Sequence, residues 1–318
     1  MKTRVLVKEG EYRLAKAGVM DAKIDAEELY CFANNCDKVF LFLRKEEEVD
    51  EKTEKKYLKL IDKRAERVPL QHITGEQEFM GLKFKVNKNV LIPRQDTETL
   101  VTEAAQTIRD EYEKAMEGLK KASIFRKFKG LDGFEILDLC CGSGAIAISL
   151  SKILETVSVS ACDISMPALK LAAENAVLNR VGVEFYQGDM FEAVKSGQQV
   201  TQEGPRGRAR GAKVKKFDMI VSNPPYIKSG IIPMLQDEVK KHEPMEALDG
   251  GRDGLDFYRI IVDQAPDYIK PGGWLIMEIG HDQGEDLRKM IKDSGRYSPA
   301  EVVKDLPGKD RVVKCQVL

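Results

Sequence analysis

From residue 134 onward, short apolar strands, glycine-containing turns and helices alternate along the chain. The strands are expected at 135–139, 157–162, 183–186, 217–221, 274–279 and 311–317, with helices at 145–153 and 167–180. Strands that alternate with helices pair in parallel, and the helices then cover both faces of the sheet. This part of the chain is therefore expected to form an α/β domain with a mostly parallel sheet.

The first 72 residues have a helical pattern instead. Apolar residues such as Leu14 and Leu29 recur at helical spacing between charged ones. Gly18 is expected to end the first helix and Asp25 to open the second. A long charged helix is expected at 48–67, before a proline at position 69. We therefore expect a small helical-bundle domain at residues 1–72.

Between the bundle and the sheet, the apolar period changes to two. The alternating residues are Phe79, Leu82, Phe84 and Val86. They predict a hairpin that turns at Met80–Gly81, and we assign residues 73–95 to a β-hairpin linker. Asp96 or Thr97 is expected to cap the next helix, so that the α/β domain covers residues 96–318.

The overall composition excludes several classes of protein. The chain has 318 residues with 51 Lys and Arg against 52 Asp and Glu, a net charge of -1. A surface that grips duplex nucleic acid throughout would need a basic excess. No apolar run approaches the roughly 18 residues of a membrane span, and no signal peptide is visible. The six cysteines lack zinc-site spacing and are too few for a disulfide scaffold. We expect reduced thiols, no metal site and a cytoplasmic location.

Two basic segments, residues 114–130 and 197–216, interrupt the α/β pattern. Charge runs of this kind are typical of solvated loops, and we expect both to be loops. The run from Arg206 to Lys216 leaves a transient contact with RNA open, although stable nucleic-acid binding is not expected.

A glycine-containing turn, Asp138–Gly144, lies between the first predicted strand of the sheet and its helix. Gly142 and Gly144 allow a ligand to approach the backbone closely. Asp163, at the end of the next strand, has the spacing of an acid that binds ribose hydroxyls. Ile146 stands where a dinucleotide-binding turn would carry its third glycine. The pattern favours a nucleoside-containing cofactor without a pyrophosphate.

The segment Asn223–Tyr226, with the sequence Asn-Pro-Pro-Tyr, follows the predicted strand at 217–221. Such a segment can be a simple turn, but it lies where doubly wound sheets bind ligands. The prolines fix the backbone, so that the Asn223 side-chain oxygen and the Pro224 carbonyl form a rigid pair of acceptors. Two acceptors can hold the two hydrogens of a planar amino group, and Tyr226 can stack on the group that carries it.

These motifs resemble those of the HemK/PrmC family, S-adenosylmethionine-dependent methyltransferases that modify a glutamine of release factors. The resemblance covers nearly the whole chain. It rests on residues 14–18, 69–75, 91–98, 136–148, 188–191, 223–227, 243–248, 250–255, 271–280 and 310–313. Methyltransferases of adenine or cytosine amino groups share the Asn-Pro-Pro-Tyr element, whereas the helical N-terminal domain with Ile92-Pro93-Arg94 is far more specific.

The resemblance implies a Rossmann-like class I methyltransferase domain with a mostly parallel seven-stranded sheet, joined to a helical domain that docks the substrate. It implies S-adenosylmethionine as cofactor, S-adenosylhomocysteine as product, and release factors as protein substrates. The activity would transfer a methyl group to the side-chain amide nitrogen of the glutamine in the Gly-Gly-Gln motif, which modulates translation termination.

The resemblance also assigns roles to individual residues. The turn under the methionine part of the cofactor would be formed by Cys140, Cys141, Gly142, Ser143 and Gly144. Asp163 would bind the ribose, Asp189 and Met190 would flank the adenine, and Asn223 would contact both cofactor and substrate. The family usually has glycine at 140, a small or hydroxyl residue at 141 and often tryptophan at 190, so Cys140, Cys141 and Met190 are departures.

The expected mechanism is direct methyl transfer to an amide nitrogen held by Asn223, Pro224, Pro225 and Tyr226, with Asn223, Pro224 and Tyr226 as catalytic residues. Neither Asp189 nor Glu243 is assignable as a general base. Three alternatives are open at this point. An amino-group methyltransferase of RNA or DNA bases would use the same amide clamp, residues 223–226, on a flipped base. A nicotinamide dehydrogenase fits the fold but neither motif, and a non-catalytic module that binds release factors or ribosomes would not need a cofactor turn.

Overall fold

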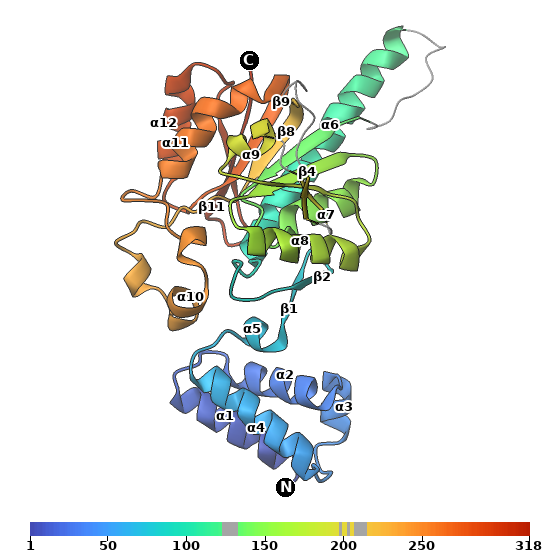
Figure 1. Cartoon of the computed structure of the whole chain (residues 1–318), viewed down its shortest axis with the longest axis vertical. Coiled ribbons are helices and arrows are strands. Elements are labelled where there is room, and N and C mark those ends of the chain that lie inside the picture. Colours follow the sequence, from blue (N-terminus) through green and yellow to red (C-terminus); the bar gives the residue numbers. More distant parts are fainter. Residues whose placement is uncertain (123–132, 197–198, 202–203, 207–214) are drawn as a thin grey trace. The chain divides into compact units, whose positions relative to one another are not determined.

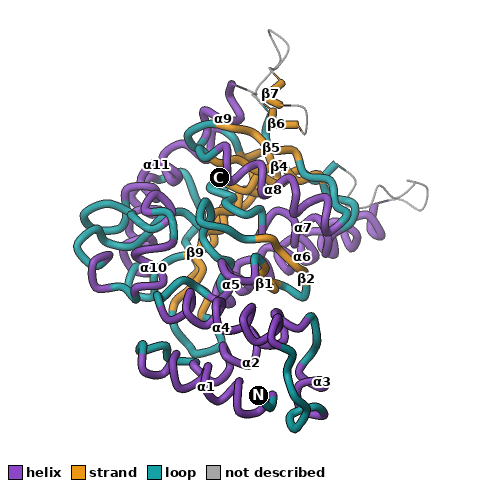
Figure 2. The backbone as a smooth tube through the Cα atoms, turned by 60° about the horizontal axis from the view of Figure 1, so that its bottom comes forward, coloured by secondary structure: helices purple, strands orange, loops and turns teal. Residues whose placement is uncertain are grey.

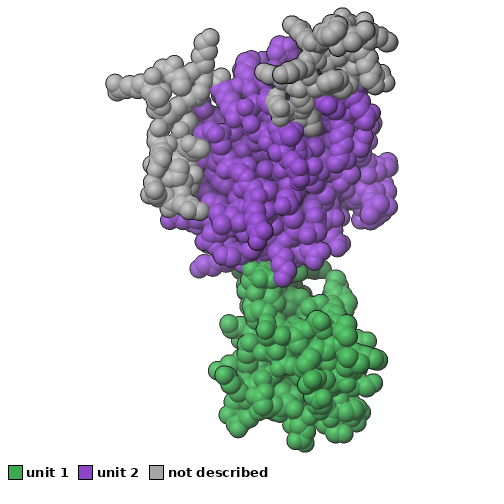
Figure 3. All heavy atoms as spheres, turned by 90° about the vertical axis from the view of Figure 1, so that its right-hand side faces the viewer, with its two compact units in different colours: residues 1–76, 234–243 green, residues 77–233, 244–318 purple. Residues whose placement is uncertain are grey.

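The computed structural model describes residues 1–122, 133–196, 199–201, 204–206 and 215–318. Its contacts divide the chain into two compact units, coloured separately in Figure 3. One unit comprises residues 1–76 and 234–243, and the other comprises residues 77–233 and 244–318. Among the described helices, none is long and apolar enough to cross a membrane. None of the six cysteines forms a disulfide.

The first unit is a bundle of helices, as the sequence predicts. Its helices are α1 (Thr3–Lys16), α2 (Ala22–Asn34), α3 (Lys38–Leu43), α4 (Glu51–Ala65), α5 (Leu70–Thr74) and α10 (Asp237–His242) (Figure 1). Leu6, Leu14, Leu29 and Ile61 are completely buried in its core. Gly18 follows α1 with a φ of 76°, a left-handed conformation that suits glycine.

Asp25 does not open the second helix, which begins at Ala22. Ala22 and Ala26 are both buried on the face that packs in the bundle, so the amphipathic pattern already holds one turn before Asp25. The Asp25 side chain is itself buried and accepts a hydrogen bond from Arg64 Nε at 2.7 Å. Asp25 therefore forms an internal ion pair with Arg64 and does not cap the helix.

The short helix α10 joins this unit through Glu238. Arg64 Nη1 and Arg67 Nε donate to Glu238 Oε1 at 3.0 and 2.8 Å. Arg67 also donates to the backbone carbonyl of Gly18 at 2.7 Å. The ion-pair network therefore runs from Asp25 through the two arginines to a segment far away in the sequence.

The predicted hairpin consists of β1 (Glu76–Phe79) and β2 (Leu82–Lys85) and turns at Met80–Gly81. All of it except Glu76 belongs to the second unit. Asp96 and Thr97 lie in the turn η1 (Gln95–Thr97), which runs directly into α6 (Glu98–Ala122). Their side chains bond elsewhere, Asp96 to Arg311 and Thr97 to Asn223. The expectation that residues 114–130 form a loop is wrong for residues 114–122, which continue α6. Residues 123–132 lie outside the described residues.

The sheet contains the seven strands that the resemblance implies. These are β3 (Glu135–Leu139), β4 (Ser158–Asp163), β5 (Glu184–Gln187), β8 (Phe217–Ser222), β9 (Ile269–Glu278), β10 (Glu301–Lys304) and β11 (Asp310–Gln316). Their order is β10-β11-β9-β8-β3-β4-β5, parallel from β9 to β5 and antiparallel at β10 and β11. The switch in chain order between β3 and β8 is the point where such sheets bind ligands.

Two more strands, β6 (Gln199–Thr201) and β7 (Gly204–Arg206), extend the sheet beyond β5 (Figure 2). The expectation that residues 197–216 form only a loop is therefore wrong for these six residues. An edge strand offers unpaired backbone groups, and β6 pairs with β5 through them. Residues 197–198, 202–203 and 207–214 lie outside the described residues.

Helices cover both faces of the sheet, because successive strand residues point to opposite sides. Ile136 and Val221 pack with residues of α6, α7 (Ala145–Leu154) and α8 (Met166–Asn179). Leu137 and Ile220 pack with residues of α9 (Phe191–Ser196), α11 (Asp256–Gln264) and α12 (Gly284–Ser294). The remaining short turns are η2 (Ile232–Met234), η3 (Met245–Ala247) and η4 (Ala265–Asp267).

Candidate active site

A cavity of about 830 Å³ lies at the carboxyl ends of β3, β4, β5 and β8. Nine of the twelve site residues predicted from the sequence line it: Cys140, Cys141, Gly142, Ser143, Asp163, Asp189, Met190, Asn223 and Pro225. Gly144, Pro224 and Tyr226 are not among the lining residues. The structure therefore brings the cofactor turn and the Asn-Pro-Pro segment to one cavity, although 80 residues separate them.

The turn after β3 is held by backbone hydrogen bonds. Cys141 N donates to Cys162 O at 3.0 Å, and Gly142 N donates to the Asp163 carboxylate at 2.8 Å. Gly142 has a φ of 53°, and a Cβ built on it would have no atom within 4 Å. The space above Gly142 is thus open cavity, which a side chain would occupy. This is the close backbone approach that a bound cofactor needs.

Gly144 does not line the cavity and instead lies where α7 packs against α8. Its φ is 79°, and it directly precedes the helix α7. A Cβ at this position would lie 3.0 Å from Ile148 Cδ1 and 3.1 Å from Ala172 Cβ. Glycine is therefore required for the packing of α7 against α8 rather than for direct contact with a ligand.

Cys140, one of the departures from the family pattern, keeps the backbone conformation of a glycine. Its φ is 61°, in the left-handed region that glycine adopts at least cost. The Cys140 and Met190 sulfur atoms are 3.5 Å apart, so these two departures contact each other. Burial raises the pKa of the Cys140 thiol above its ordinary range, which keeps the thiol uncharged and poorly nucleophilic.

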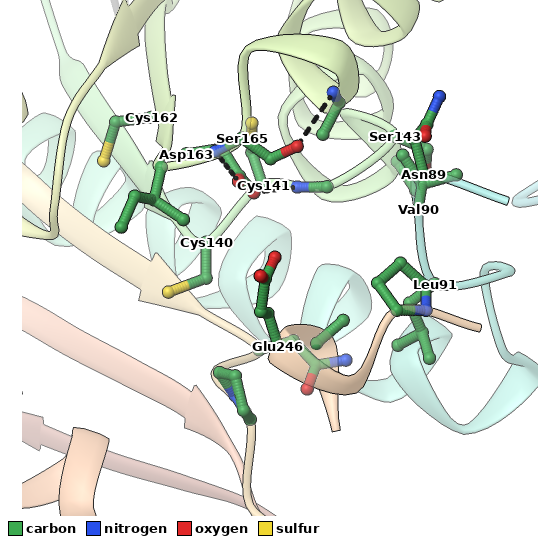
Figure 4. A pocket seen from close by; sticks show the side chains of 18 of the residues that line it. Asn89, Val90, Leu91, Cys140, Cys141, Ser143, Cys162, Asp163, Ser165 and Glu246 are labelled. Atoms are coloured by element: carbon green, nitrogen blue, oxygen red, sulfur yellow. Dashed lines mark hydrogen bonds between the residues drawn. The ribbon is translucent and has the colours of Figure 1, made fainter. Parts of the chain in front are cut away.

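Asp163 ends β4 and holds the turn on both sides. One carboxylate oxygen accepts from Gly142 N and the other from Ser165 N, both at 2.8 Å. Burial, chiefly, and the carboxylate of Glu246 raise the pKa of Asp163. Figure 4 shows Asp163 and Glu246 projecting toward the cavity from separate segments. Each oxygen can still accept a hydroxyl, as a ribose-binding role requires.

Gly188, Asp189 and Met190 form the wall that follows β5. Gly188 has a φ of 156°, and a Cβ there would lie 2.7 Å from Ala193 Cα. Met190 is buried, whereas Asp189 is exposed. A flexible apolar side chain beside a solvent-exposed carboxylate suits a flat base with polar edges. The adenine site at these residues stays a prediction.

The Asn223–Tyr226 segment is held rigidly by the residues behind it. Gln283 Nε2 donates to the carbonyls of Tyr226 and Gly254 at 3.1 and 3.0 Å. Gly250 lies so close that a Cβ on it would be 2.7 Å from Tyr226 Cα. Pro225 and the Asn223 side chain consequently stay at the wall of the cavity.

Tyr226 points its hydroxyl away from the cavity lining, to Glu278. The hydroxyl donates to Glu278 Oε1 at 3.1 Å, and Glu278, at the end of β9, is 1% exposed. Burial raises the pKa of Glu278 to about 7, although Thr97, the charge of Arg311 and the Tyr226 hydroxyl act to lower it. Stacking of Tyr226 on a substrate stays a prediction.

The sequence reasoning missed Thr97 and Glu278 as site residues. Thr97 lines the cavity, and its Oγ1 accepts a hydrogen bond from Asn223 Nδ2 at 3.2 Å. The cavity wall also contains residues 88–91 together with Pro244, Glu246, Ala247 and Asp249, to which the sequence alone assigns no role. Thr97, Glu278, Leu91 and the lining residues from 244 to 247 lie in segments that resemble the family, at 91–98, 243–248 and 271–280. Residues 88–90 and 249 lie outside those segments.

Among the described residues, no group of three or more His, Cys, Asp or Glu side chains is placed to hold a metal ion. The cavity instead offers apolar residues, a glycine turn and carboxylates, of which Ile146, Gly142 and Asp163 are examples. This set of groups fits a nucleoside with an attached amino acid, such as S-adenosylmethionine.

The strand order, the glycine turn after β3 and the acid at the end of β4 define a class I methyltransferase domain, an S-adenosylmethionine-dependent enzyme fold. Residues 6–75 match the family described as PrmC N-terminal domain, and residues 122–201 match the methyltransferase small domain. A solved structure, the human methyltransferase 10 domain containing protein, has a TM-score of 0.48 and 12% identity. The likeness covers 75% of this chain and 88% of that one.

Curated relatives match over nearly the full length of the chain. The release factor glutamine methyltransferase of Geobacter sulfurreducens is 38% identical, over 94% of this chain and 91% of the relative. The proteins of that name from Clostridium botulinum and Moorella thermoacetica are 35% and 36% identical, each over 98% of this chain and over 98% and 97% of their own lengths. The chain belongs to the family of release factor glutamine methyltransferases.

Proposed function

We propose that this protein transfers a methyl group from S-adenosylmethionine to the side-chain amide nitrogen of the glutamine in the Gly-Gly-Gln motif of release factors, and so modulates translation termination. The observation that carries the proposal is the single cavity lined by both the Cys140–Ser143 turn and Asn223. One cavity can therefore hold a cofactor and an amide side by side, which direct transfer requires.

The residues of this chain would hold the cofactor and aim the amide. Cys140, Cys141, Gly142, Ser143 and Asp163 would hold the methionine and ribose parts, with Asp189 and Met190 at the adenine. When bound, S-adenosylmethionine supplies an electrophilic methyl group on a sulfonium. Asn223 and the Pro224 carbonyl accept the two amide hydrogens, and their hydrogen bonds strengthen as positive charge develops on the nitrogen. The amide proton then leaves to solvent.

The helical unit is the proposed docking element for the release factor. Its surface carries exposed apolar side chains on α2 and α3, including Phe32, Val39 and Phe42 at 42%, 67% and 69% exposure. Large apolar side chains of this kind are suited to contact with a protein partner. We place the enzyme in the cytoplasm, where release factors act.

Stable nucleic-acid binding is not part of the proposal. Lys215, which belongs to the second basic run, pairs with Glu135 at 2.7 Å and with Glu184 at 3.3 Å. The charge of Lys215 is therefore neutralised by carboxylates of the second unit and is not available to bind the phosphates of a nucleic acid.

The test uses methyl-labelled S-adenosylmethionine with a purified bacterial release factor, RNA or DNA. Label on the release factor, lost when the glutamine of its Gly-Gly-Gln motif is replaced by alanine, supports the proposal. Label on nucleic acid alone would show that the substrate is a nucleic acid, held by the same Asn223–Tyr226 segment. Binding of release factor without binding of S-adenosylmethionine would mean a non-catalytic module.

A further inference from the structure

Two sulfur-containing side chains from separate segments meet at the wall of the cavity. Cys140 directly follows β3, and Met190 comes three residues after the end of β5. Both residues line the cavity. The Cys140 thiol donates a hydrogen bond to the Met190 thioether, with 3.5 Å between Sγ and Sδ. The contact therefore joins the segments that follow β3 and β5 across the intervening strand β4.

The backbone on both sides of this contact is held by Cys162 in β4. Cys162 O accepts a hydrogen bond from Cys141 N at 3.0 Å, which fixes the turn that carries Cys140. The Cys162 thiol donates to the backbone carbonyl of Met190 at 3.6 Å. Cys162 is 1% exposed and packs in the core of the sheet domain. Because both main chains are held, a change in one of the two side chains has to be absorbed by the other.

Cys140 and Met190 also share an uncommon backbone conformation. Their φ angles are 61° and 46°, in the left-handed region that residues with a Cβ adopt only at a cost. Seven non-glycine residues in the described part of the chain have a positive φ, and of these only Cys140 and Met190 line the cavity. The other five lie just after a helix or in the hairpin turn. Strain at two residues that contact each other in a cavity indicates a functional constraint.

The two side chains share one limited volume. At 3.5 Å the sulfur atoms are in contact, so no atom fits between them. Met190 is 7% exposed and belongs to a buried apolar cluster, so it has no free space behind it. A larger side chain at position 190 would therefore have to take the space of the Cys140 thiol or enter the cavity. An unbranched thioether is the kind of side chain that adapts to such a space.

We propose that Cys140 and Met190 act as one unit in binding S-adenosylmethionine, so that the fit between the two side chains, and not either residue alone, sets the affinity for the cofactor. The inference rests on the proposed function, which places the adenine of the cofactor against this wall. Met190 is the residue that contacts the adenine, with its polarizable thioether. Cys140 is the positioning residue that holds the thioether in place.

The first experiment is a double-mutant cycle in which calorimetric titration measures the dissociation constant of S-adenosylmethionine. Met190→Trp puts a rigid ring into the space of the Cys140 thiol, so it should raise this constant about 10-fold. Cys140→Gly removes the group that holds Met190 and should raise it about 3-fold. In the double variant the ring takes the space that the thiol leaves. Its constant should therefore return to within about 3-fold of the wild type, whereas two independent residues would give an increase of roughly 30-fold.

A second cycle avoids any enlarged side chain and combines Met190→Ala with Cys140→Gly. Both substitutions remove the same contact, so the double variant should bind the cofactor no more weakly than Met190→Ala alone. This cycle decides the question if Met190→Trp alone does not fold, which thermal unfolding of the ligand-free variants reveals.

Two further variants and a kinetic measurement make the result specific. Met20, 77% exposed and in the other unit, provides the matched control, because Met20→Trp should neither change the affinity nor restore it in Cys140→Gly. Cys140→Ser keeps a hydrogen-bond donor of similar size and should bind within about 3-fold of the wild type. With a release factor as substrate, the KM for S-adenosylmethionine should follow the dissociation constants, whereas kcat at saturating cofactor should change about 2-fold or less.

The outcomes separate this inference from the proposed function. A wild type that does not bind S-adenosylmethionine overturns the function and the inference together. A wild type that binds the cofactor and methylates the release factor, while the effects of the single variants simply multiply in both cycles, overturns the inference alone. Unchanged affinity in Met190→Trp and Cys140→Gly also overturns it, because the contact would then have no part in binding the cofactor.

Discussion

Gly250 lies against the backbone of Tyr226: a Cβ on Gly250 would be 2.7 Å from Tyr226 Cα and 2.9 Å from the carbonyl oxygen of Pro225. The neighbouring atoms belong to the backbone and cannot rotate away. Ile227 N also donates to Leu248 O, and Gly250 N to Ile227 O, so both segments are fixed. The position of the clamp is therefore set by a glycine outside the cavity.

Gly250→Ala is expected to move the Asn-Pro-Pro segment and to lower kcat by about 10-fold or more, because small displacements of positioning groups are costly in catalysis. The matched control is Gly230→Ala, whose added Cβ would meet no atom within 4 Å. Steady-state kinetics with a release factor measure both variants. Equal kcat values in the two would show that the clamp tolerates this contact.

Substitutions of the two glycines in the cofactor turn are expected to have different effects, one on cofactor binding and the other on stability. Gly142→Ala places a methyl group in open cavity, so it should weaken S-adenosylmethionine binding about 10-fold or more with a stability cost of only about 1 kcal/mol. Gly144→Ala meets Ile148 and Ala172, so it should cost about 1–3 kcal/mol of folding stability. Calorimetric titration and thermal unfolding distinguish the two effects. The assignment fails if both variants lose affinity and stability to the same degree.

Asp163 and Asn223 are expected to affect different kinetic constants. Asp163→Ala removes the carboxylate that holds Gly142 N, so it should raise the dissociation constant of S-adenosylmethionine. Asn223→Ala removes an acceptor for the substrate amide and should lower kcat about 100-fold or more. Cofactor titration and single-turnover kinetics measure the two constants. Wild-type turnover in Asn223→Ala would remove that residue from the clamp.

Local patterns in the sequence predict much of this fold. The alternation of strands and helices predicts the parallel strands, because each element buries its own apolar face. The turn around Gly142 and the acid at Asp163 are likewise readable from spacing along the chain. Both are expected at the carboxyl edge of the sheet, and both line the cavity there.

Contacts between distant residues could not be predicted in this way. Thr97 and Asn223 are 126 residues apart in sequence, and only the fold brings them within hydrogen-bond distance. The same holds for Glu238, whose partners Arg64 and Arg67 belong to helices near the N-terminus. The prediction that Asp25 opens a helix is wrong for a related reason, since an acid near a helix start suggests a cap, whereas Asp25 pairs with the distant Arg64.

Glu238→Gln is expected to loosen the segment 234–243. Although burial opposes the effect, hydrogen bonds from Arg67 and Arg64 lower the pKa of Glu238, so the carboxylate stabilises the fold above its ordinary pKa and less as the pH falls through its folded value. The variant should lose about 1–3 kcal/mol of stability and exchange amide hydrogens faster in this segment. Glu285→Gln, on a carboxylate that is 85% exposed, is the control and should change little. Equal exchange in both variants would contradict the role of Glu238.

Glu278 is expected to make the free energy of unfolding depend on pH. Burial raises the pKa of this group from 4.5 to about 7, so the folded protein binds a proton that the unfolded chain has already lost. The stabilising contribution of that proton is complete below about pH 4.5 and is lost as the pH rises through about 7. Glu278→Gln has no such dependence. Relative to this variant, the wild type should lose roughly 3 kcal/mol of unfolding free energy across that range.

Urea unfolding of the wild type and Glu278→Gln, measured at about pH 5 and about pH 8, provides the test. Glu285→Gln again serves as control, because this side chain is 85% exposed. A difference between wild type and Glu278→Gln that stays constant with pH would mean that Glu278 ionises normally in the fold.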